Sequence, residues 1–267
     1  MFDVLSRYTA AVTEHPDAAP RVPRRTPGRA DGIRARNRAS IASDLREVAR
    51  RQLGEVGPAA LSLRAVARDM GMVPSALFRY VSGRDELLTL LIVDAYTSLG
   101  DAVDREHALV DPTDFHGRWR AIAGAMRTWA LAHPHEWALL YGSPVPTYHA
   151  PGERTNDAGT RVARLLIMLG VDAVRAGTAA HAPFGPADDA LDLAERATGT
   201  LREDPEQVTG GLPAVPLANG LTAWTMLVGA VSGEVFEQLG GDTIADRGAY
   251  FDYQMAAAAV ILFGRGG

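Results

Sequence analysis

The sequence predicts an all-α protein with an N-terminal three-helix head of the helix-turn-helix kind and a larger helical body. Apolar residues recur at spacings of three and four through most of the chain, which is the period of helices that pack along one face. Two short stretches of this kind lie next to each other in residues 61–81 and are separated by Gly71 and Pro74. The basic residues gather in the part of the chain that contains this pair.

The composition is that of a folded intracellular protein. The chain has 267 residues, of which 47% are hydrophobic, so it can bury one large core or two modest ones. Because cysteine is absent, a disulfide framework, thiolate metal ligands and thiol catalysis are excluded. The first residues lack the basic segment of a signal peptide, and no apolar run approaches the length of a membrane span. We therefore expect a cytoplasmic protein without a membrane partner.

The net charge of −5 conceals an asymmetry along the chain. Residues 21–90 contain 14 of the 27 basic residues, all of them arginine, together with seven acids. The remaining residues contain 13 basic and 25 acidic side chains. A basic front on an acidic body is typical of a DNA-binding head joined to a regulatory part, although a chance clustering of solvated charges gives the same counts.

Residues 1–38 are expected to form a flexible N-terminal arm. Residues 21–38 contain seven arginines, two prolines and two glycines against one acid, and such a segment cannot form a core. An arm of this kind can follow DNA phosphates or enter an A·T-rich minor groove. The alternative is a linker that promotes solubility.

Residues 39–86 are predicted to form the head. Its first helix covers residues 40–53 and ends before Gly54 and Gly57. Ser62 can cap the second helix, whose apolar stripe ends at Gly71, a residue that tolerates positive φ.

The third helix is predicted over residues 73–80, since proline suits the first helical position and Pro74 stands there. Ser82 and Asp85 match a capping box that opens a long helix from Arg84 to about residue 106. The side chains of Ser75, Ala76, Arg79 and Tyr80 fall away from the apolar stripe, and such side chains suit a DNA major groove. The alternative is an ordinary helical hairpin whose polar face meets water.

From Ser40 to about Leu91 the sequence resembles the TetR family of bacterial transcriptional regulators. The matching positions follow the family pattern without a gap, and they are Ser62, Leu63, Arg64, Val66, Ala67, Gly71, Leu77, Phe78, Tyr80, Val81, Ser82, Arg84 and Leu87. Val73 departs from the Ser or Thr that is frequent in the family, Phe78 replaces a Tyr, and Tyr80 replaces a His. The resemblance implies that the head binds a double-stranded DNA operator. The residues expected at DNA are Arg64, Val73, Pro74, Ser75, Ala76, Phe78, Arg79, Tyr80 and Arg84, with Arg84 on a phosphate.

Residues 87–267 are predicted to form the body. Helical spacing indicates helices over residues 114–132, 135–141, 158–169, 217–239 and 250–263, and a modest one near residues 188–202, while residues 147–157 are expected to be a loop. Residues 127–144 resemble a W-A-x-x-H-P pattern that is common in the C-terminal domain of an actinobacterial-type branch of TetR regulators. In TetR-like proteins two C-terminal helices pair protomers into a four-helix bundle, so we expect a homodimer; the alternative is that both helices are buried within one monomer.

Aromatic and methionine side chains in the body are candidates for an apolar effector pocket. They are Trp119, Met126, Trp129, Tyr141, Met168 and Trp224, and at helical spacing such residues also form ordinary core. A body with few inward-pointing charges suits a small apolar effector.

The sequence shows no catalytic constellation, cofactor motif or metal site. Pro134 separates His133 from His135 and Glu136, so they cannot align as ligands on one helix and are interpreted as a structural turn. We therefore expect a sequence-specific DNA-binding regulator, a repressor released by a small apolar effector, and not an enzyme. The alternative is a helical small-molecule-binding protein or enzyme with no DNA role, and an activator or nucleoid-associated protein would share the fold.

Overall fold

The computed structural model describes residues 29–181, 187–202, 209, 211–240 and 242–264, and every regular element in this part of the chain is a helix. The head contains α2 (Arg29–Ala60), α3 (Leu63–Asp69) and α4 (Pro74–Leu77), and α5 (Arg84–His107) leads from the head into the body. The body contains α6 (Phe115–Ala132), α7 (Pro134–Tyr141), α8 (Gly152–Gly159), α9 (Arg161–Arg175), α10 (Ala187–Arg202), α12 (Ala214–Val235) and α13 (Arg247–Phe263). The prediction of an all-α head and body is confirmed.

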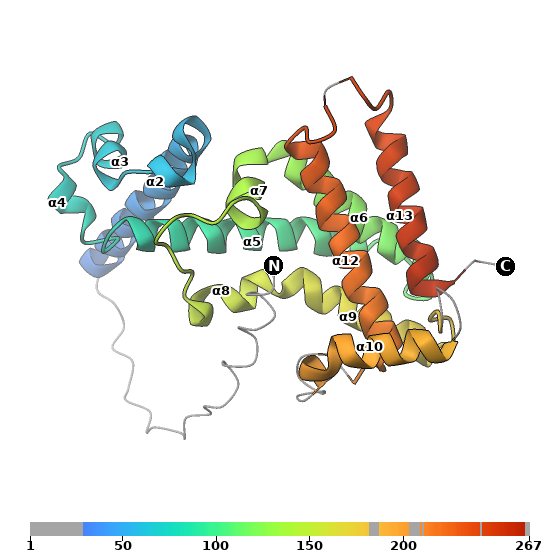
Figure 1. Ribbon diagram of the computed structural model, residues 1–267. Coiled ribbons are helices and arrows are strands. Elements are labelled where there is room, and N and C mark those ends of the chain that lie inside the picture. The colour runs from blue at the N-terminus through green and yellow to red at the C-terminus, as the bar shows by residue number, and fades with distance from the viewer. Residues whose placement is uncertain (1–28, 182–186, 203–208, 210, 241, 265–267) are drawn as a thin grey trace, which may run out of the picture.

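Helix α5 holds the head and the body together. Its first turns place Leu87, Leu88 and Leu91 in the core of the head, whereas Ala95, Leu99 and Val103 lie in the core of the body. At about 1.5 Å per residue its 24 residues span roughly 36 Å. Figure 1 shows α5 running through the molecule, with α2, α3 and α4 at one end and α12 and α13 standing beside the other.

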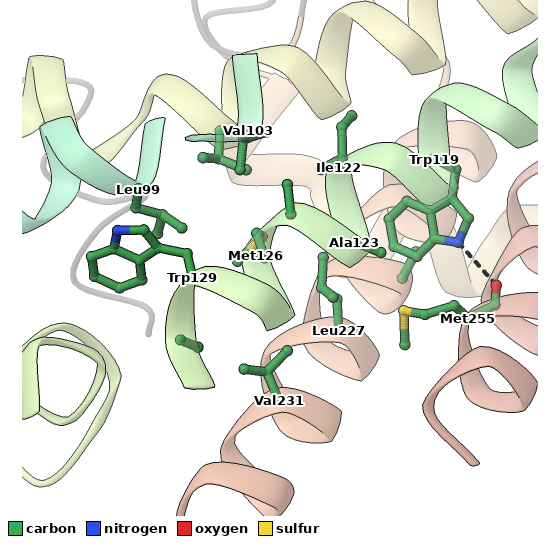
Figure 2. Packing of buried hydrophobic residues seen from close by; sticks show 14 of the residues in the cluster. Leu99, Val103, Trp119, Ile122, Ala123, Met126, Trp129, Leu227, Val231 and Met255 are labelled. Carbon is green, nitrogen blue, oxygen red and sulfur yellow. Dashed lines mark hydrogen bonds between the residues drawn. The ribbon is translucent and has the colours of Figure 1, made fainter. Parts of the chain in front are cut away.

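The body core forms around three buried tryptophans, two on α6 and one on α7, and the indole nitrogen of each has a hydrogen-bond partner. The indole nitrogen of Trp119 donates to the carbonyl of Met255 at 2.9 Å, which ties α6 to α13 (Figure 2). Trp129 donates to Ser98 on α5, and Trp137 of α7 donates to Ser232 on α12. Each indole therefore buries apolar area without leaving an unpaired donor.

Helix α12 is the one described helix long and apolar enough, by length and composition, to cross a membrane. The expectation that no apolar run reaches that length therefore has an exception. In the structure α12 packs against α13, α10, α9 and α6, and buried positions such as Ala223, Leu227 and Val231 recur along it. Its apolar composition is accounted for by contact with helices on several sides.

The first helix is longer than predicted at both ends. It begins at Arg29 instead of residue 40, so the last ten residues of the predicted flexible arm are helical; residues 1–28 lie outside the described part. Arginine and alanine are frequent there and both have high helix propensity. At the other end the helix passes Gly54 and is interrupted at Gly57, whose φ of 71° is outside the helical range.

Two boundaries in the body also differ. The predicted loop over residues 147–157 is wrong in its second half, because α8 begins at Gly152, and the helix predicted over 158–169 is α9, which runs from Arg161 to Arg175. Only Thr155 of α8 is buried, so this helix has no apolar stripe that the sequence could show. The predicted helices at 114–132, 135–141, 188–202, 217–239 and 250–263 all exist, with ends that differ by a few residues.

Candidate nucleic-acid interface and body cavity

The turn between α3 and α4 is built as the sequence predicts. Ser62 stands at the N-cap of α3, although its side chain makes no capping hydrogen bond. Gly71 has a φ of 64°, and the amide of Met72 reaches back to the carbonyl of Ala67 at 2.8 Å, which closes the end of the helix. Pro74 occupies the first turn of α4, where its missing N–H leaves no helical hydrogen bond unmade.

Helix α4 is presented outward at the end of the head that is remote from the body (Figure 1). Leu77 is fully buried and anchors it, while Val73 is 65% and Phe78 is 59% exposed. Pro74, Ser75 and Arg79 are also exposed, and Ala76 and Tyr80 are half-buried. The helix is shorter than the predicted 73–80, because residues after Leu77 continue as a turn in which the amides of Tyr80 and Val81 both donate to its carbonyl.

Two arginines beside α4 have guanidinium groups that form no ion pair within the part of the chain that the structure describes. Arg64 on α3 and Arg79 after α4 are both exposed, and neither forms an ion pair with any described residue. Arg68, also on α3, lies 3.6 Å from the carboxylate of its neighbour Asp69. Exposed arginines flanking a small, partly apolar face are the arrangement that phosphate contacts on both sides of a groove require.

Arg84 has partners inside the head. Its guanidinium donates to the carbonyls of Pro58, Ala59 and Leu61 at 2.9, 3.0 and 3.2 Å. These carbonyls lie where α2 ends, and helix ends leave such acceptors without an internal partner. Arg84 therefore closes the α2–α3 corner, and its expected contact with a phosphate stays a prediction.

The capping arrangement at the start of α5 differs from the predicted one in both the cap residue and the acidic residue. Gly83, not Ser82, is the N-cap residue, and the amide of Ser82 donates to the carboxylate of Glu86 at 2.5 Å. Glu86, not Asp85, is thus the acid that completes the turn. Hydrogen bonds from Ser82 hold the pKa of Glu86 below its usual range, and Arg154 of α8 acts in the same direction.

A segment between α7 and α8 connects the body to the head. We call residues 142–151 the strap, and Figure 1 shows it passing from α7 along α5 toward the head before it reaches α8. Val145 and Tyr148 of the strap pack against the head core, and the Tyr148 hydroxyl lies 2.8 Å from that of Thr89. Just beyond the strap, Arg154 lies 3.8 Å from Glu86.

The body contains a cavity of about 220 Å³ between α5, α7, α9 and α12. Its described lining is mostly aliphatic, aromatic and glycine residues, and no described lining residue is charged. The lining residues with polar side-chain atoms are Tyr96, Tyr141, Thr209 and Trp224. A second hollow of about 210 Å³ lies between the end of α12 and the start of α13, and it is lined in part by Glu234, Glu237 and Arg247.

Of the six residues predicted for an effector pocket, the structure brings two to the cavity. Tyr141 and Trp224 line it. Trp119, Met126 and Trp129 are buried in the body core, and Met168 is half-exposed on α9. For Trp119, Met126 and Trp129 the alternative of ordinary core is therefore the better description, and Met168 does not line the cavity.

Sequence reasoning missed most of the cavity wall. The wall includes Leu166 and Ile167 on α9, Leu212 before α12 and Leu221 on it, which are indistinguishable in sequence from core leucines. Four glycines also line it, namely Gly142, Gly159, Gly170 and Gly220. Gly159 and Gly220 lie inside predicted helices and were the available signal, since a glycine leaves room where a side chain would otherwise fill the space.

The histidines near Pro134 have structural partners. His133 forms a hydrogen bond with the carbonyl of Trp129 and stacks on its ring, and Glu136 lies 3.5 Å from Arg50 on α2. No group of three or more potential metal ligands is found among the described residues. The contacts of His133 and Glu136 agree with the interpretation of this turn as a structural one.

The outer face of α13, which packs beside α12, carries large apolar side chains that no described residue covers. On α13 Tyr253 is 74% exposed, Val260 is 40% exposed and Tyr250 is 38% exposed. These two helices lie side by side (Figure 1). Such a face is available to a second copy of the chain.

Comparison with known proteins gives matches in both parts of the chain. Residues 45–91 match the sequence profile of bacterial regulatory proteins of the tetR family, and residues 119–258 match that of the tetracyclin repressor-like C-terminal domain. The chain is 43% identical over 233 residues to an HTH-type transcriptional regulator of Mycobacterium tuberculosis, covering 86% of this chain and 96% of that protein.

Two solved structures show the same arrangement of helices. The regulatory protein SCO4313 has a TM-score of 0.65 at 30% identity, covering 84% of this chain and 97% of that one. A protein of unknown function from Rhodococcus sp. RHA1 has a TM-score of 0.58 at 24% identity, covering 82% and 92%. The second likeness concerns the fold alone.

Proposed function

The chain belongs to the TetR family of transcriptional regulators, with a helix-turn-helix DNA-binding domain and a C-terminal ligand-binding domain, and from this premise we propose how it works. The proposal is a repressor whose head binds an operator and is released when a small apolar molecule occupies the body cavity. The outward presentation of α4, anchored by Leu77 and flanked by Arg64 and Arg79, is the observation that supports it best.

The division of labour in the head follows from exposure. Ser75, Ala76 and Phe78 line the face that would enter a major groove, where side chains meet base edges. Arg64 and Arg79 would contact phosphates at the rim, with Tyr80 beside them, because unpaired guanidinium groups can form bidentate bonds with phosphate oxygens. Val73 and Pro74, at the start of α4, would determine how closely this helix approaches the DNA backbone. Counterion release then supplies much of the affinity, so binding should weaken steeply with salt.

The proposed division of the chain is an arm over residues 1–38, whose last ten residues form the start of α2, a head over 39–86 and a body over 87–267. Helix α5 crosses the boundary between head and body with buried side chains in both cores. Any ligand that favours one position of α5 relative to the body therefore also favours one position of the head. A differential affinity of about 1–3 kcal/mol is typical of such coupling.

The proposed assembly is a cytoplasmic homodimer that pairs through α12 and α13. Exposed Tyr253 and Val260 on α13 support this, as does the requirement for two heads to read a two-fold operator. We propose no catalytic activity. A metal or cofactor has no role in the proposal.

The proposal is tested by selecting bound fragments from genomic DNA and repeating the binding with each selected fragment in a gel shift. We expect the selected fragments to share a two-fold sequence pattern. Ser75→Ala should change which bases are preferred, whereas Arg79→Ala should lower the affinity for all fragments alike. No selection of any fragment would favour the alternative of a helical carrier or enzyme without a DNA role. A reporter gene placed behind a selected fragment separates a repressor from an activator or a nucleoid-associated protein.

A further inference from the structure

The Tyr141 hydroxyl has no hydrogen-bond partner among the residues that the structure describes. Its ring is held firmly, with Trp137 at 4.3 Å between centroids, Trp224 at 6.2 Å and Tyr96 at 6.3 Å. The buried indoles of Trp119 and Trp137, by contrast, are paired within the body. Because Tyr141 lines the cavity and its hydroxyl is not paired with a described residue, this hydroxyl can bond with a molecule that enters the cavity.

The cavity around this hydroxyl selects against charge. No described residue that lines it is ionised, and burial raises the pKa of the Tyr141 hydroxyl well above its ordinary value, with Tyr96 adding to the effect. The hydroxyl therefore stays protonated and can donate a hydrogen bond. A carboxylate or ammonium group placed there would lose its hydration without gaining a counter-charge.

The size of the cavity sets the scale of what fits. A dry apolar cavity of about 150 Å³ accepts benzene, so about 220 Å³ accepts one ring with substituents or a small fused pair. The walls supply aromatic edges from Trp224 and Tyr96 and aliphatic groups from Leu166 and Leu221. These surfaces suit a flat, mostly apolar molecule.

We infer that the effector is an uncharged, mainly apolar molecule of this size with one hydrogen-bond acceptor, and that Tyr141 determines specificity by donating to that acceptor. The inference rests on the proposed function in that it takes the cavity as the effector site. It goes further by assigning the polar contact and by excluding charged ligands.

The test uses three probes that share one ring system: naphthalene, 2-naphthaldehyde and 2-naphthoate. Calorimetric titration of the full chain should show binding of naphthalene and tighter binding of 2-naphthaldehyde, and no binding of 2-naphthoate. In Tyr141→Phe, which keeps the ring contacts, affinity for 2-naphthaldehyde should fall roughly fivefold to tenfold, as loss of one hydrogen bond implies, while naphthalene is unaffected. Equal weakening of both neutral probes, or binding of the naphthoate as tight as that of the aldehyde, would overturn the inference.

A second variant tests whether the probes bind in this cavity. A Cβ atom added at Gly220 meets no atom within 4 Å, and Gly220 lines the cavity, so Gly220→Leu should fill it and abolish binding of both neutral probes. Gly124 on α6 is a matched control, because it is also a helical glycine with open space around its Cβ and does not line the cavity. Both replacements raise helix propensity.

The failure of this inference differs from the failure of the proposed function. If neither neutral probe binds while the wild-type protein still shifts its selected DNA fragment, the ligand assignment is wrong and DNA binding stands. If Gly220→Leu still binds the probes with unchanged affinity, the effector site is elsewhere and the assignment of Tyr141 is withdrawn.

Discussion

At the scale of single residues, His107 shows how a side chain can make the body sensitive to pH. The Nε2 atom of His107 accepts a hydrogen bond from Nε of Arg118 at 3.1 Å, and Arg118 also donates to Asp172 at 2.9 Å. These contacts join α5, α6 and α9. Burial lowers the pKa of His107 below its usual value, and the charge of Arg118 lowers it further. A protonated imidazole has no lone pair to offer, so protonation breaks this contact.

The sign of the pH dependence follows from that lowered pKa. In the unfolded chain His107 has the ordinary histidine pKa of about 6.5, so as pH falls it binds a proton earlier than it does in the folded chain. The stabilisation is therefore complete above about pH 6.5 and is lost as pH falls toward the folded-state pKa. The side chain of glutamine does not titrate but can still accept a hydrogen bond from Arg118. We therefore expect the melting temperature of His107→Gln to fall less between pH 7.5 and pH 5.5 than that of the wild type. A difference of roughly 2–4 °C corresponds to one hydrogen bond.

The control for His107 is His149→Gln, since His149 is an exposed histidine. Its melting temperature should change with pH as the wild type's does. If His107→Gln also follows the wild type, another titrating group governs the pH dependence and the assignment to His107 is incorrect.

Arg84 gives a second prediction at this scale. Because its guanidinium donates to three carbonyls at the α2–α3 corner, Arg84→Ala should destabilise the protein by about 2 kcal/mol in chemical denaturation. Arg68→Ala is the control, since Arg68 is exposed and lies near only its neighbour Asp69. Normal stability of Arg84→Ala combined with a loss of DNA affinity would contradict the positioning role and favour the predicted contact with a phosphate.

Single residues also mark where sequence reasoning stops. The positive φ of Gly71, the place of Pro74 and the exposure of Arg79 follow from local chemistry, and the structure agrees with each. The partners of Arg84 could not be predicted, because the carbonyls it binds are about 25 residues away in sequence. In the sequence Trp119 and Tyr141 are both aromatic residues at helical spacing, yet Trp119 lies in the core and Tyr141 lines the cavity.

At the scale of elements, the strap fixes the position of the head relative to the body. The Tyr148–Thr89 contact and the Arg154–Glu86 pair both act on the first two turns of α5, and Glu86 in turn holds the amide of Ser82. The strap begins at Gly142, next to Tyr141 in the cavity wall. It is thus a direct physical route between the cavity and the end of the DNA-reading turn.

We predict that the double variant Tyr148→Phe and Arg154→Gln loosens this contact without unfolding the body. Hydrogen exchange of amides in residues 82–90 should quicken about fivefold, the effect of losing roughly 1 kcal/mol of local stability. Arg164→Gln is the matched control, because Arg164 pairs with exposed Asp157 and touches no part of the head. Unchanged exchange in the double variant would mean that α5 alone positions the head.

Elements differ in how readily their sequence predicts them. Helices α6, α12 and α13 have buried residues at regular spacing, so their existence follows from the pattern. Helix α8 buries one residue and is stabilised by local contacts such as the hydrogen bond from Thr155 to the carbonyl of Pro151, so periodicity cannot reveal it. The early start of α2 does not follow from the sequence pattern, because a segment dense in arginine with few apolar residues is also typical of a chain without regular structure.

At the scale of the whole molecule, two copies are expected to pair through α12 and α13. Tyr253→Glu places a charge on the exposed face of α13 and should shift the mass in solution toward 28.5 kDa, the mass of one chain. Leu193→Glu on α10 is the control, since Leu193 is 60% exposed but lies outside that face. Light scattering after size-exclusion chromatography measures both. A Tyr253→Glu protein that remains dimeric would place the interface elsewhere.

The most direct measurement of the central claim, that the α4 end of the head is the DNA surface, compares two charge-matched double variants by fluorescence anisotropy. The head variant is Arg64→Ala with Arg79→Ala, and the body variant is Arg120→Ala with Arg175→Ala, where all four arginines are exposed. On a selected fragment the head variant should bind at least tenfold more weakly. The slope of log affinity against log salt should become shallower by about four, because each of the two heads of the proposed dimer loses two phosphate contacts. The body variant should match the wild type. Equal losses in the two variants would show that charge alone, and not this surface, is responsible for DNA binding.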